Sequence, residues 1–305
     1  ISMEGCVAFA PAYRVVVTRE ADVGGEILRI YGLDNIPLSE HLSAHFISEF
    51  PLIDVEKTQQ TIAQSLAAKG FHEIITNSLT KGDYHGWISN DLGFDSVEIL
   101  NRLSEDLGVM CQHMVFAGLE SLAHNINRRQ KDLKLFEFGK TYHKTDNNAY
   151  AEQQHLSLYL TGNVVAQGWN TKVQKADLYY LKGVAANILK SAHSGKISFK
   201  ELQPDNLVNS TAVYIGETAV GLLGEVSPAG LKMFDIKQPV FYADLNMDAL
   251  YHLKAKPILY KEISKFPAVN RDLALVVDKN VSYSQIEGIA LSAKINQLSN
   301  VQLFD

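Results

Sequence analysis

Hydrophobic and polar residues alternate along the chain in two different periods, one typical of helices and one typical of strands. Apolar residues recur every three or four positions in four segments: residues 27–31, 54–70, 113–132 and 177–191. Strand-like patterns fill five others: residues 71–79, 134–143, 155–162, 212–226 and 240–250. Helices mixed with mainly antiparallel strands predict an α+β fold.

Local signals place several element ends. Gly32, followed by Pro37, ends the first predicted helix, and Asp54 suits the N-cap of the second, which Gly70 terminates. The segment 212–226 predicts a hairpin that turns at Gly216 and Glu217. Residues 155–162 alternate three leucines with Ser, Tyr and Thr, so we expect a strand with one buried and one solvated face.

A last apolar run, LALVV in residues 273–277, follows Pro267 and is bounded by charges. This pattern is typical of a buried strand that opens a new domain after a rigid linker.

Composition narrows the class of protein. The chain has 305 residues, of which 46% are hydrophobic and 20% charged, as in soluble proteins with more than one domain. No apolar run approaches a membrane span, and no signal peptide opens the chain, which starts at Ile1 like an internal piece of a longer polypeptide. Cys6 and Cys111 cannot form a disulfide framework, so we expect two reduced thiols in a cytoplasmic protein.

Charge argues against this chain being the main clamp on a nucleic acid, because the formal net charge is −6. A local basic group, Arg128, Arg129 and Lys131, nevertheless follows a predicted helix. These cations either contact phosphate or simply face water at the helix end.

Candidate chemistry is sparse. Asp22 and Glu26 are four residues apart and share a predicted helix face, so they could hold a hard cation, although on spacing alone a solvated helix face is the better explanation. His113, His124 and His143 match no ligand spacing, and no base can be named that would activate Cys111. The sequence contains no phosphate-binding glycine loop, H-E-x-x-H or paired C-x-x-C.

Four long, collinear stretches resemble the β subunit of bacterial phenylalanyl-tRNA synthetase: residues 13–37, 101–144, 221–250 and 260–287. The resemblance implies three parts. Residues 1–45 correspond to the end of a small helical or winged domain, and residues 46–265 to a core with the class II synthetase fold, an antiparallel sheet flanked by helices. Residues 266–305 correspond to the truncated start of a ferredoxin-fold anticodon-binding domain.

The resemblance also implies an inactive core. Class II synthetases carry an arginine in an F-R-x-E pattern, and this chain has Leu135 two residues before Glu137. A hydrophobic side chain cannot stabilise the charge that develops on phosphates. We therefore expect no catalytic residue here, with ATP used on a separate α subunit. The editing pocket of the family lies upstream, so we expect no editing of mischarged tRNA.

The family's magnesium site follows the pattern D-x5-D-x2-E-E. Its second and last positions fall on Asp22 and Glu26, whereas the first and third fall on Val16 and Gly25, which offer no side-chain oxygen. Cys111 stands where the family usually has an arginine, a bidentate donor that cysteine cannot replace.

The resemblance thus predicts a non-catalytic β-subunit portion of phenylalanine–tRNA ligase. Its expected partners are the α subunit, in an α2β2 heterotetramer, and tRNA(Phe), with Arg128, Arg129 and Lys131 as weak contacts. The alternatives are a stand-alone RNA-binding module that uses the same three cations, and a metal-dependent enzyme built on Asp22, Glu26 and the histidines.

Overall fold

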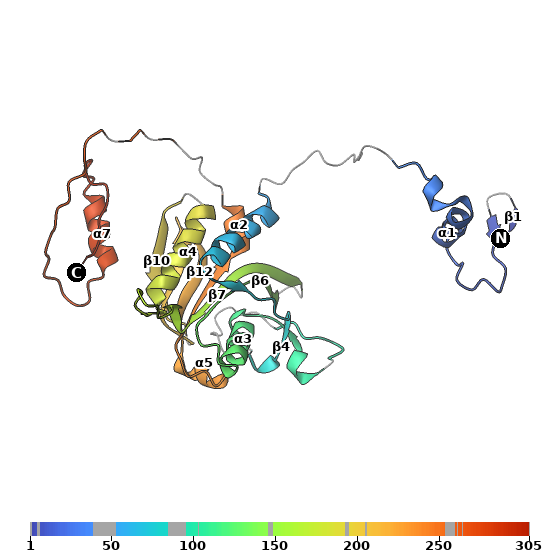
Figure 1. Ribbon diagram of the computed structural model, residues 1–305, viewed down its shortest axis with the longest axis horizontal. Helices are drawn as coiled ribbons and strands as arrows, with labels where there is room; N and C mark the ends of the chain where they lie inside the picture. Colours follow the sequence, from blue (N-terminus) through green and yellow to red (C-terminus); the bar gives the residue numbers. More distant parts are fainter. Residues whose placement is uncertain are drawn as a thin grey trace. The chain divides into compact units, whose positions relative to one another are not determined.

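The computed structural model describes residues 2–4, 7–38, 53–84, 96–102, 104–145, 149–192, 195–204, 206–253, 260, 262–263 and 265–304 (Figure 1). The chain divides into two compact units, Ile1–Lys256 and Pro257–Asp305, each of which is described by itself.

The first elements form a small segment. Strand β1 (Ser2–Glu4) pairs antiparallel with β2 (Val7–Phe9), and helix α1 (Glu20–Tyr31) is followed by the short 3-10 helix η1 (Leu33–Asn35). The helix predicted from the apolar spacing at 27–31, with Asp22 and Glu26 on one face, is confirmed. At its first turn the Asp22 side chain accepts the backbone N–H groups of Thr18 and Arg19. Gly32, with φ of 90°, ends it.

A seven-stranded sheet forms the centre of the first unit. Its strands, in spatial order, are β10 (Ile197–Glu201), β11 (Leu207–Ile215), β12 (Thr218–Val226), β13 (Val240–Asn246), β7 (Tyr150–Thr161), β6 (Leu133–Lys144) and β3 (His72–Glu73). The α+β class and the hairpin turn at Gly216 are confirmed. The sheet is mixed rather than purely antiparallel, since β3 runs parallel to β6 at one edge. A long connection that includes a helix separates these two strands, as parallel pairing requires.

One face of the sheet packs against α2 (Val55–Ala68), α4 (Leu178–Ala192) and α6 (Met247–His252). Asp54 caps α2 as predicted, because its carboxylate accepts the backbone N–H of Lys57 at 3.0 Å. Leu156, Leu158 and Leu160 of β7 are fully buried on this side.

The other face packs against α3 (Val115–Asn127) and the short α5 (Pro228–Met233). Helix α3 covers this face of β7. The β7 residues Ser157, Tyr159 and Thr161 are therefore also 0% exposed. The prediction that this strand has a solvated face is therefore wrong: its polar side chains are buried and hydrogen-bonded instead.

Short elements complete the unit. They are η2 (Gly82–Tyr84), η4 (Glu105–Leu107), and the strand pairs β4 (Leu79–Thr80) with β5 (Val109–Met110) and β8 (Asn163–Val165) with β9 (Gln174–Lys175). The strand predicted over 71–79 is thus reduced to the two-residue strands β3 and β4.

The second unit contains one helix, α7 (Tyr283–Ser292), among its described residues. Its Ser282 and Gln285 form a capping box, and the Tyr283 hydroxyl donates to the Val301 carbonyl at 2.9 Å. Residues 270–278 form no strand, and Val276 is fully exposed, so the prediction of a buried strand is wrong for this structure. A strand needs a partner for its backbone groups, and the described part of residues 265–304 supplies none. Among the described helices, none has the length and apolarity to cross a membrane.

Candidate functional site: the polar face of the central sheet

A row of polar side chains lies on the sheet face that α3 covers. Glu137 of β6 is opposite Ser157 of β7, which is opposite Asp244 of β13. Side chains alternate between the two faces of a strand, so every second residue of these strands joins the same row. His155 and Tyr242 extend the row along β7 and β13.

His155 links three strands through hydrogen bonds. Its Nδ1 lies 2.9 Å from Oδ1 of Asp244, and its Nε2 lies 3.0 Å from Oγ1 of Thr141. Burial opposes protonation of this imidazole, but the Asp244 carboxylate and the weaker influence of Asp248 together raise the pKa of His155 above its ordinary value. Each ring nitrogen of the imidazole therefore has a hydrogen-bond partner, a carboxylate at Nδ1 and a hydroxyl at Nε2.

Glu137 is almost completely buried, at 3% exposed. Its Oε1 accepts the backbone N–H of Thr76 at 2.6 Å and the hydroxyl of the same residue at 2.7 Å. Burial raises the pKa of Glu137 above its ordinary value, although the Thr76 hydrogen bonds act in the opposite direction. This carboxyl ties the segment after β3 to the sheet.

Protein atoms fill the space over this row. The Tyr159 hydroxyl donates to the backbone carbonyl of Met114 at 2.6 Å. A Cβ added at Gly118 of α3 would lie 2.0 Å from the Tyr159 ring, and one added at Gly139 would lie 2.1 Å from the Met114 side chain. Helix α3 and the sheet are therefore in direct contact at these positions.

The strands β6, β7 and β13 place no lysine or arginine on this face. Leu135, which replaces the arginine of the F-R-x-E pattern, is 4% exposed and packs in the cluster formed with α3. In the register of Leu135 and Glu137, none of the residues that β6, β7 and β13 contribute is lysine or arginine. The arrangement holds neighbouring strands together, and β6, β7 and β13 supply no lysine or arginine of the kind that stabilises the charge of a triphosphate.

Cys111 is buried against this site and inert. Burial raises the pKa of its thiol to about 12, and Sγ contacts the His113 carbonyl at 3.4 Å. Cys6 lies outside the described residues. Within the described ranges, no three His, Cys, Asp or Glu side chains gather where they could hold a metal ion.

The two predicted magnesium ligands lie on α1, and both already have protein partners. Asp22 caps the helix, accepting N–H groups at 3.0 and 2.8 Å, and these hydrogen bonds hold its pKa below the ordinary value. Glu26 forms ion pairs with Arg14 and with Arg29. Two engaged carboxylates do not make a magnesium site by themselves, so we derive no magnesium chemistry from them. Their assignment as ligands stays a prediction.

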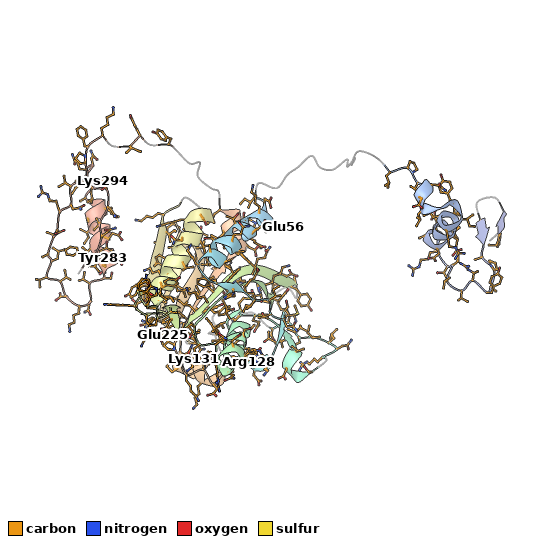
Figure 2. The ribbon with its side chains drawn as sticks, in the orientation of Figure 1. Glu56, Arg128, Lys131, Glu225, Tyr283 and Lys294 are labelled. Atoms are coloured by element: carbon orange, nitrogen blue, oxygen red, sulfur yellow. The ribbon has the colours of Figure 1, made fainter. Side chains whose placement is uncertain are left out.

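The predicted phosphate-contacting cations lie together at the C-terminal end of α3 (Figure 2). Arg128 donates to the His124 carbonyl at 3.1 Å, and Arg129 adopts a φ of 69° just after the helix. The Lys131 carbonyl accepts a hydrogen bond from Gln238 at 2.7 Å. All three side chains are exposed, and no described carboxylate forms an ion pair with them.

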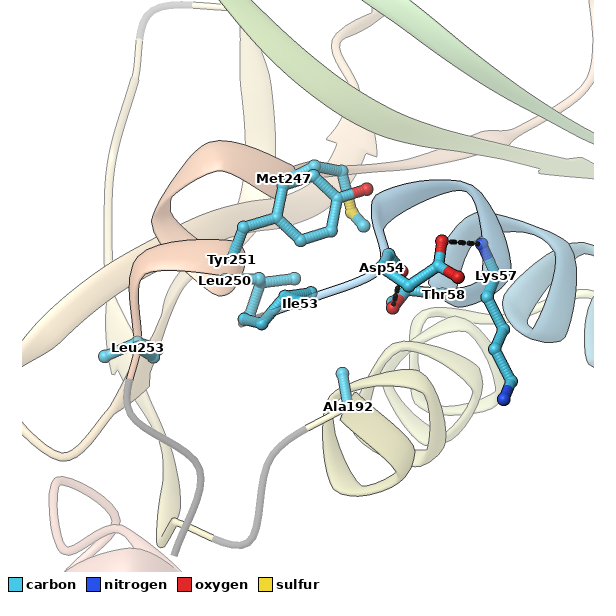
Figure 3. A pocket seen from close by; sticks show the side chains of 9 residues that line it. All are labelled: Ile53, Asp54, Lys57, Thr58, Ala192, Met247, Leu250, Tyr251 and Leu253. Atoms are coloured by element: carbon cyan, nitrogen blue, oxygen red, sulfur yellow. Dashed lines mark hydrogen bonds between the residues drawn. The ribbon is translucent and has the colours of Figure 1, made fainter. Parts of the chain in front are cut away.

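A cavity of about 310 Å³ opens on the opposite side of the sheet, between the start of α2 and the end of α6 (Figure 3). Its lining is mostly apolar: Ile53, Asp54, Lys57, Thr58, Ala192, Met247, Leu250, Tyr251 and Leu253. Three of these residues, Ile53, Ala192 and Leu253, stand next to stretches outside the described ranges. We assign no ligand to this cavity.

Comparison with known proteins decides the family. Residues 48–247 match the family described as phenylalanyl tRNA synthetase beta chain CLM domain, and residues 264–305 match the ferredoxin-fold anticodon binding domain. The chain belongs to the phenylalanyl-tRNA synthetase beta chain family. Membership favours the synthetase interpretation over a stand-alone RNA-binding module or a metal-dependent enzyme.

Curated relatives carry the same name. Phenylalanine–tRNA ligase beta subunit of Bacteroides thetaiotaomicron is 39% identical over 100% of this chain, and that of Porphyromonas gingivalis is 35% identical over 97%. The chain spans only 38% of the length of each. A crystal structure of pyrrolysyl-tRNA synthetase from Desulfitobacterium hafniense matches with a TM-score of 0.50 at 16% identity, covering 80% of this chain and 82% of that one. This likeness supports a class II synthetase fold for the core.

The sequence did not point to the buried polar row. His155 and Asp244 come from strands far apart in the chain, and their contact depends on the strand order β13–β7–β6. The serine and histidine within β7 were a usable signal, because a strand with polar residues on a buried face must satisfy them internally.

Proposed function

We propose that this chain is a non-catalytic portion of a phenylalanine–tRNA ligase β subunit, which assembles with the α subunit and supports tRNA(Phe). ATP-dependent charging of the tRNA with phenylalanine belongs to the assembled ligase, with ATP bound on α. The observation that carries the proposal is the closed sheet face: Tyr159 and Gly118 fill it, and Leu135 stands where a cation would be needed.

The proposal assigns the chain to three predicted domains. Residues 46–265 form the synthetase-like core, residues 1–45 the end of the preceding small domain, and residues 266–305 the start of the anticodon-binding domain. The α2β2 stoichiometry and a place in the cytoplasm, where translation occurs, complete the proposal. No editing of mischarged tRNA is expected from this portion.

Mixing the chain with purified α subunit tests the assembly. Native mass measurement is expected to show a complex of the two chains. A parallel assay of phenylalanine-dependent ATP–pyrophosphate exchange should give activity only when α is present. Adenylate formation by the chain alone would overturn the proposal, as would failure of the two chains to assemble at micromolar concentration.

A further inference from the structure

The hairpin of β8 and β9 presents an aromatic side chain to solvent. Residues 165–175 are exposed throughout, and Trp169 is 97% exposed. The Gly168 N–H donates to the Thr171 carbonyl at 3.3 Å, so Trp169 and Asn170 form the tip of the turn. Gly168 suits this tight turn, because a Cβ there would lie 2.5 Å from the Thr171 hydroxyl oxygen. The turn thus holds the indole out from the surface.

The base of the hairpin is firmly fixed. Val164 is 8% exposed within the core, and the Ala176 N–H donates to the Gly162 carbonyl at 2.9 Å. Oδ1 of Asp132 accepts both the backbone N–H of Asn163, at 2.8 Å, and its side-chain amide, at 3.1 Å. Trp169 is therefore carried on a hairpin whose base does not depend on a partner.

The same base adjoins the cationic end of α3. A Cβ at Gly162 would lie 2.3 Å from the Lys131 carbonyl oxygen, so the two backbones are in close contact. Residues 128–132 and 161–177 together carry five cations, Arg128, Arg129, Lys131, Lys172 and Lys175, against two carboxylates. Both carboxylates are engaged locally: Asp132 bonds the hairpin base, and Asp177 accepts the Tyr180 N–H at 2.7 Å. This basic surface contrasts with the net charge of −6 of the whole chain.

We propose that Trp169 stacks on an unpaired base of the bound tRNA while Lys172, Lys175 and the Arg128–Lys131 group contact its phosphates. An aromatic ring flanked by cations is the combination that binds single-stranded nucleic acid. A protein partner fits less well, since the core of a protein interface is depleted in lysine. The inference rests on the proposed function, which supplies the tRNA.

The test uses the chain assembled with α and a tRNA(Phe) transcript as the probe. Trp169→Ala is expected to weaken binding by roughly 5- to 150-fold, because base stacking contributes about that much per base. Trp169→Phe retains a stacking surface and should recover most of the affinity. Leu100→Ala removes another fully exposed apolar side chain and should leave binding unchanged. A blunt RNA duplex, which has no unpaired base, should bind the wild type and Trp169→Ala equally.

The possible outcomes distinguish failure of the stacking inference from failure of the proposed function. If wild type assembles with α and binds tRNA but Trp169→Ala binds as tightly, the stacking inference fails and the proposed function stands. If Trp169→Ala instead dissociates α from the chain, the hairpin is a protein contact and the inference also fails. If wild type neither assembles nor binds tRNA, the proposed function itself fails.

Two further measurements use the same complex. Lys172→Ala combined with Lys175→Ala should reduce the slope of log affinity against log salt by about 1.5, because two phosphate contacts are lost. With Trp87→Phe, Trp169 becomes the single tryptophan of the chain, and its fluorescence should be quenched when tRNA binds. An unchanged salt slope together with unchanged emission would overturn the inference.

Discussion

Gly118 of α3 and Tyr159 of β7 are in such close contact that a methyl group could not be placed between them. The Cβ that Gly118 lacks would lie 2.0 Å from Cε1 of the tyrosine ring, while the tyrosine hydroxyl is held by the Met114 carbonyl. The ring cannot swing away without losing this hydrogen bond, and burial of an unpaired hydroxyl is costly. The contact closes this part of the sheet face, on which Leu135 and Glu137 also lie.

Gly118→Ala is expected to destabilise the core. Overpacking of this kind costs typically about 1–3 kcal/mol, and here the nearest atoms belong to a fully buried ring. Urea unfolding monitored by circular dichroism measures the change in the free energy of unfolding.

Gly183→Ala is the matched control. Gly183 also lies in a helix, α4, but a Cβ there would meet nothing within 4 Å. Replacing this exposed helical glycine should stabilise the protein by up to about 1 kcal/mol through helix propensity. If both variants changed stability in the same direction, close packing at Gly118 would not be the cause of its effect.

Leu135→Arg tests whether a single missing charge accounts for the proposed lack of catalysis by the core. The substituted side chain would enter the buried cluster beneath α3, on the same face of β6 as the buried carboxyl of Glu137. We expect a loss of at least about 3 kcal/mol of stability, because a large charged side chain would replace a close-packed leucine, and no gain of ATP–pyrophosphate exchange. Leu135→Met, which conserves volume, should cost less than about 1.5 kcal/mol. Exchange activity in folded Leu135→Arg protein would contradict the closed-site argument.

Helices were predicted well from the sequence because their signals are local. The stripe in α3, the Asp54 cap of α2 and the glycine at the end of α1 all act within a few residues. The order of the strands in the sheet could not be predicted from the hydrophobic pattern, because the pairing of β13 with β7 joins residues 79 to 91 positions apart in the chain.

Two strand predictions failed for opposite reasons. In β7 the polar side chains indicated a solvated face, but α3 covers them and hydrogen bonds within the sheet replace water. In residues 273–277 the apolar run indicated burial, but the described residues of that unit provide no strand to pair with it. In both cases the burial of the strand is decided by the element that packs or pairs with it, and the sequence pattern of one segment does not contain that element. The same holds for the candidate site. Leu135 was identified from a sequence motif, but its burial depends on α3, a neighbour that the motif does not contain.

Cys111 should resist alkylation in the folded protein. Its thiol is 2% exposed, and burial raises its pKa to about 12, so at pH 8 both access and the thiolate are lacking. In a Cys6→Ser background, which leaves Cys111 as the single thiol, iodoacetamide should react only after unfolding in guanidinium. Mass spectrometry counts the added group. Rapid labelling under native conditions would show that the segment around Cys111, between β5 and α3, opens in the folded protein.

The His155–Asp244 pair predicts a pH dependence of stability with a defined sign. The pKa of His155 is raised in the folded state, so the folded protein binds its proton more tightly than the unfolded chain does. This contribution is fully present below a pH of about 6.5, the ordinary histidine value, and is lost as pH rises through the raised pKa. Unfolding free energies from urea titrations between roughly pH 5.5 and 8 should therefore fall with rising pH.

Asp244→Asn supplies the control for this slope. The amide keeps the shape of the side chain and can accept from Ser157, but it removes the charge that offsets burial of the imidazole. The pKa of His155 should drop, since burial then acts against protonation with only the more distant Asp248 carboxylate opposing it. The fall in stability with pH should become shallower or reverse, and the histidine ring signals in NMR should titrate at lower pH. Equal slopes in the two proteins would mean that another group, not His155, carries the pH dependence.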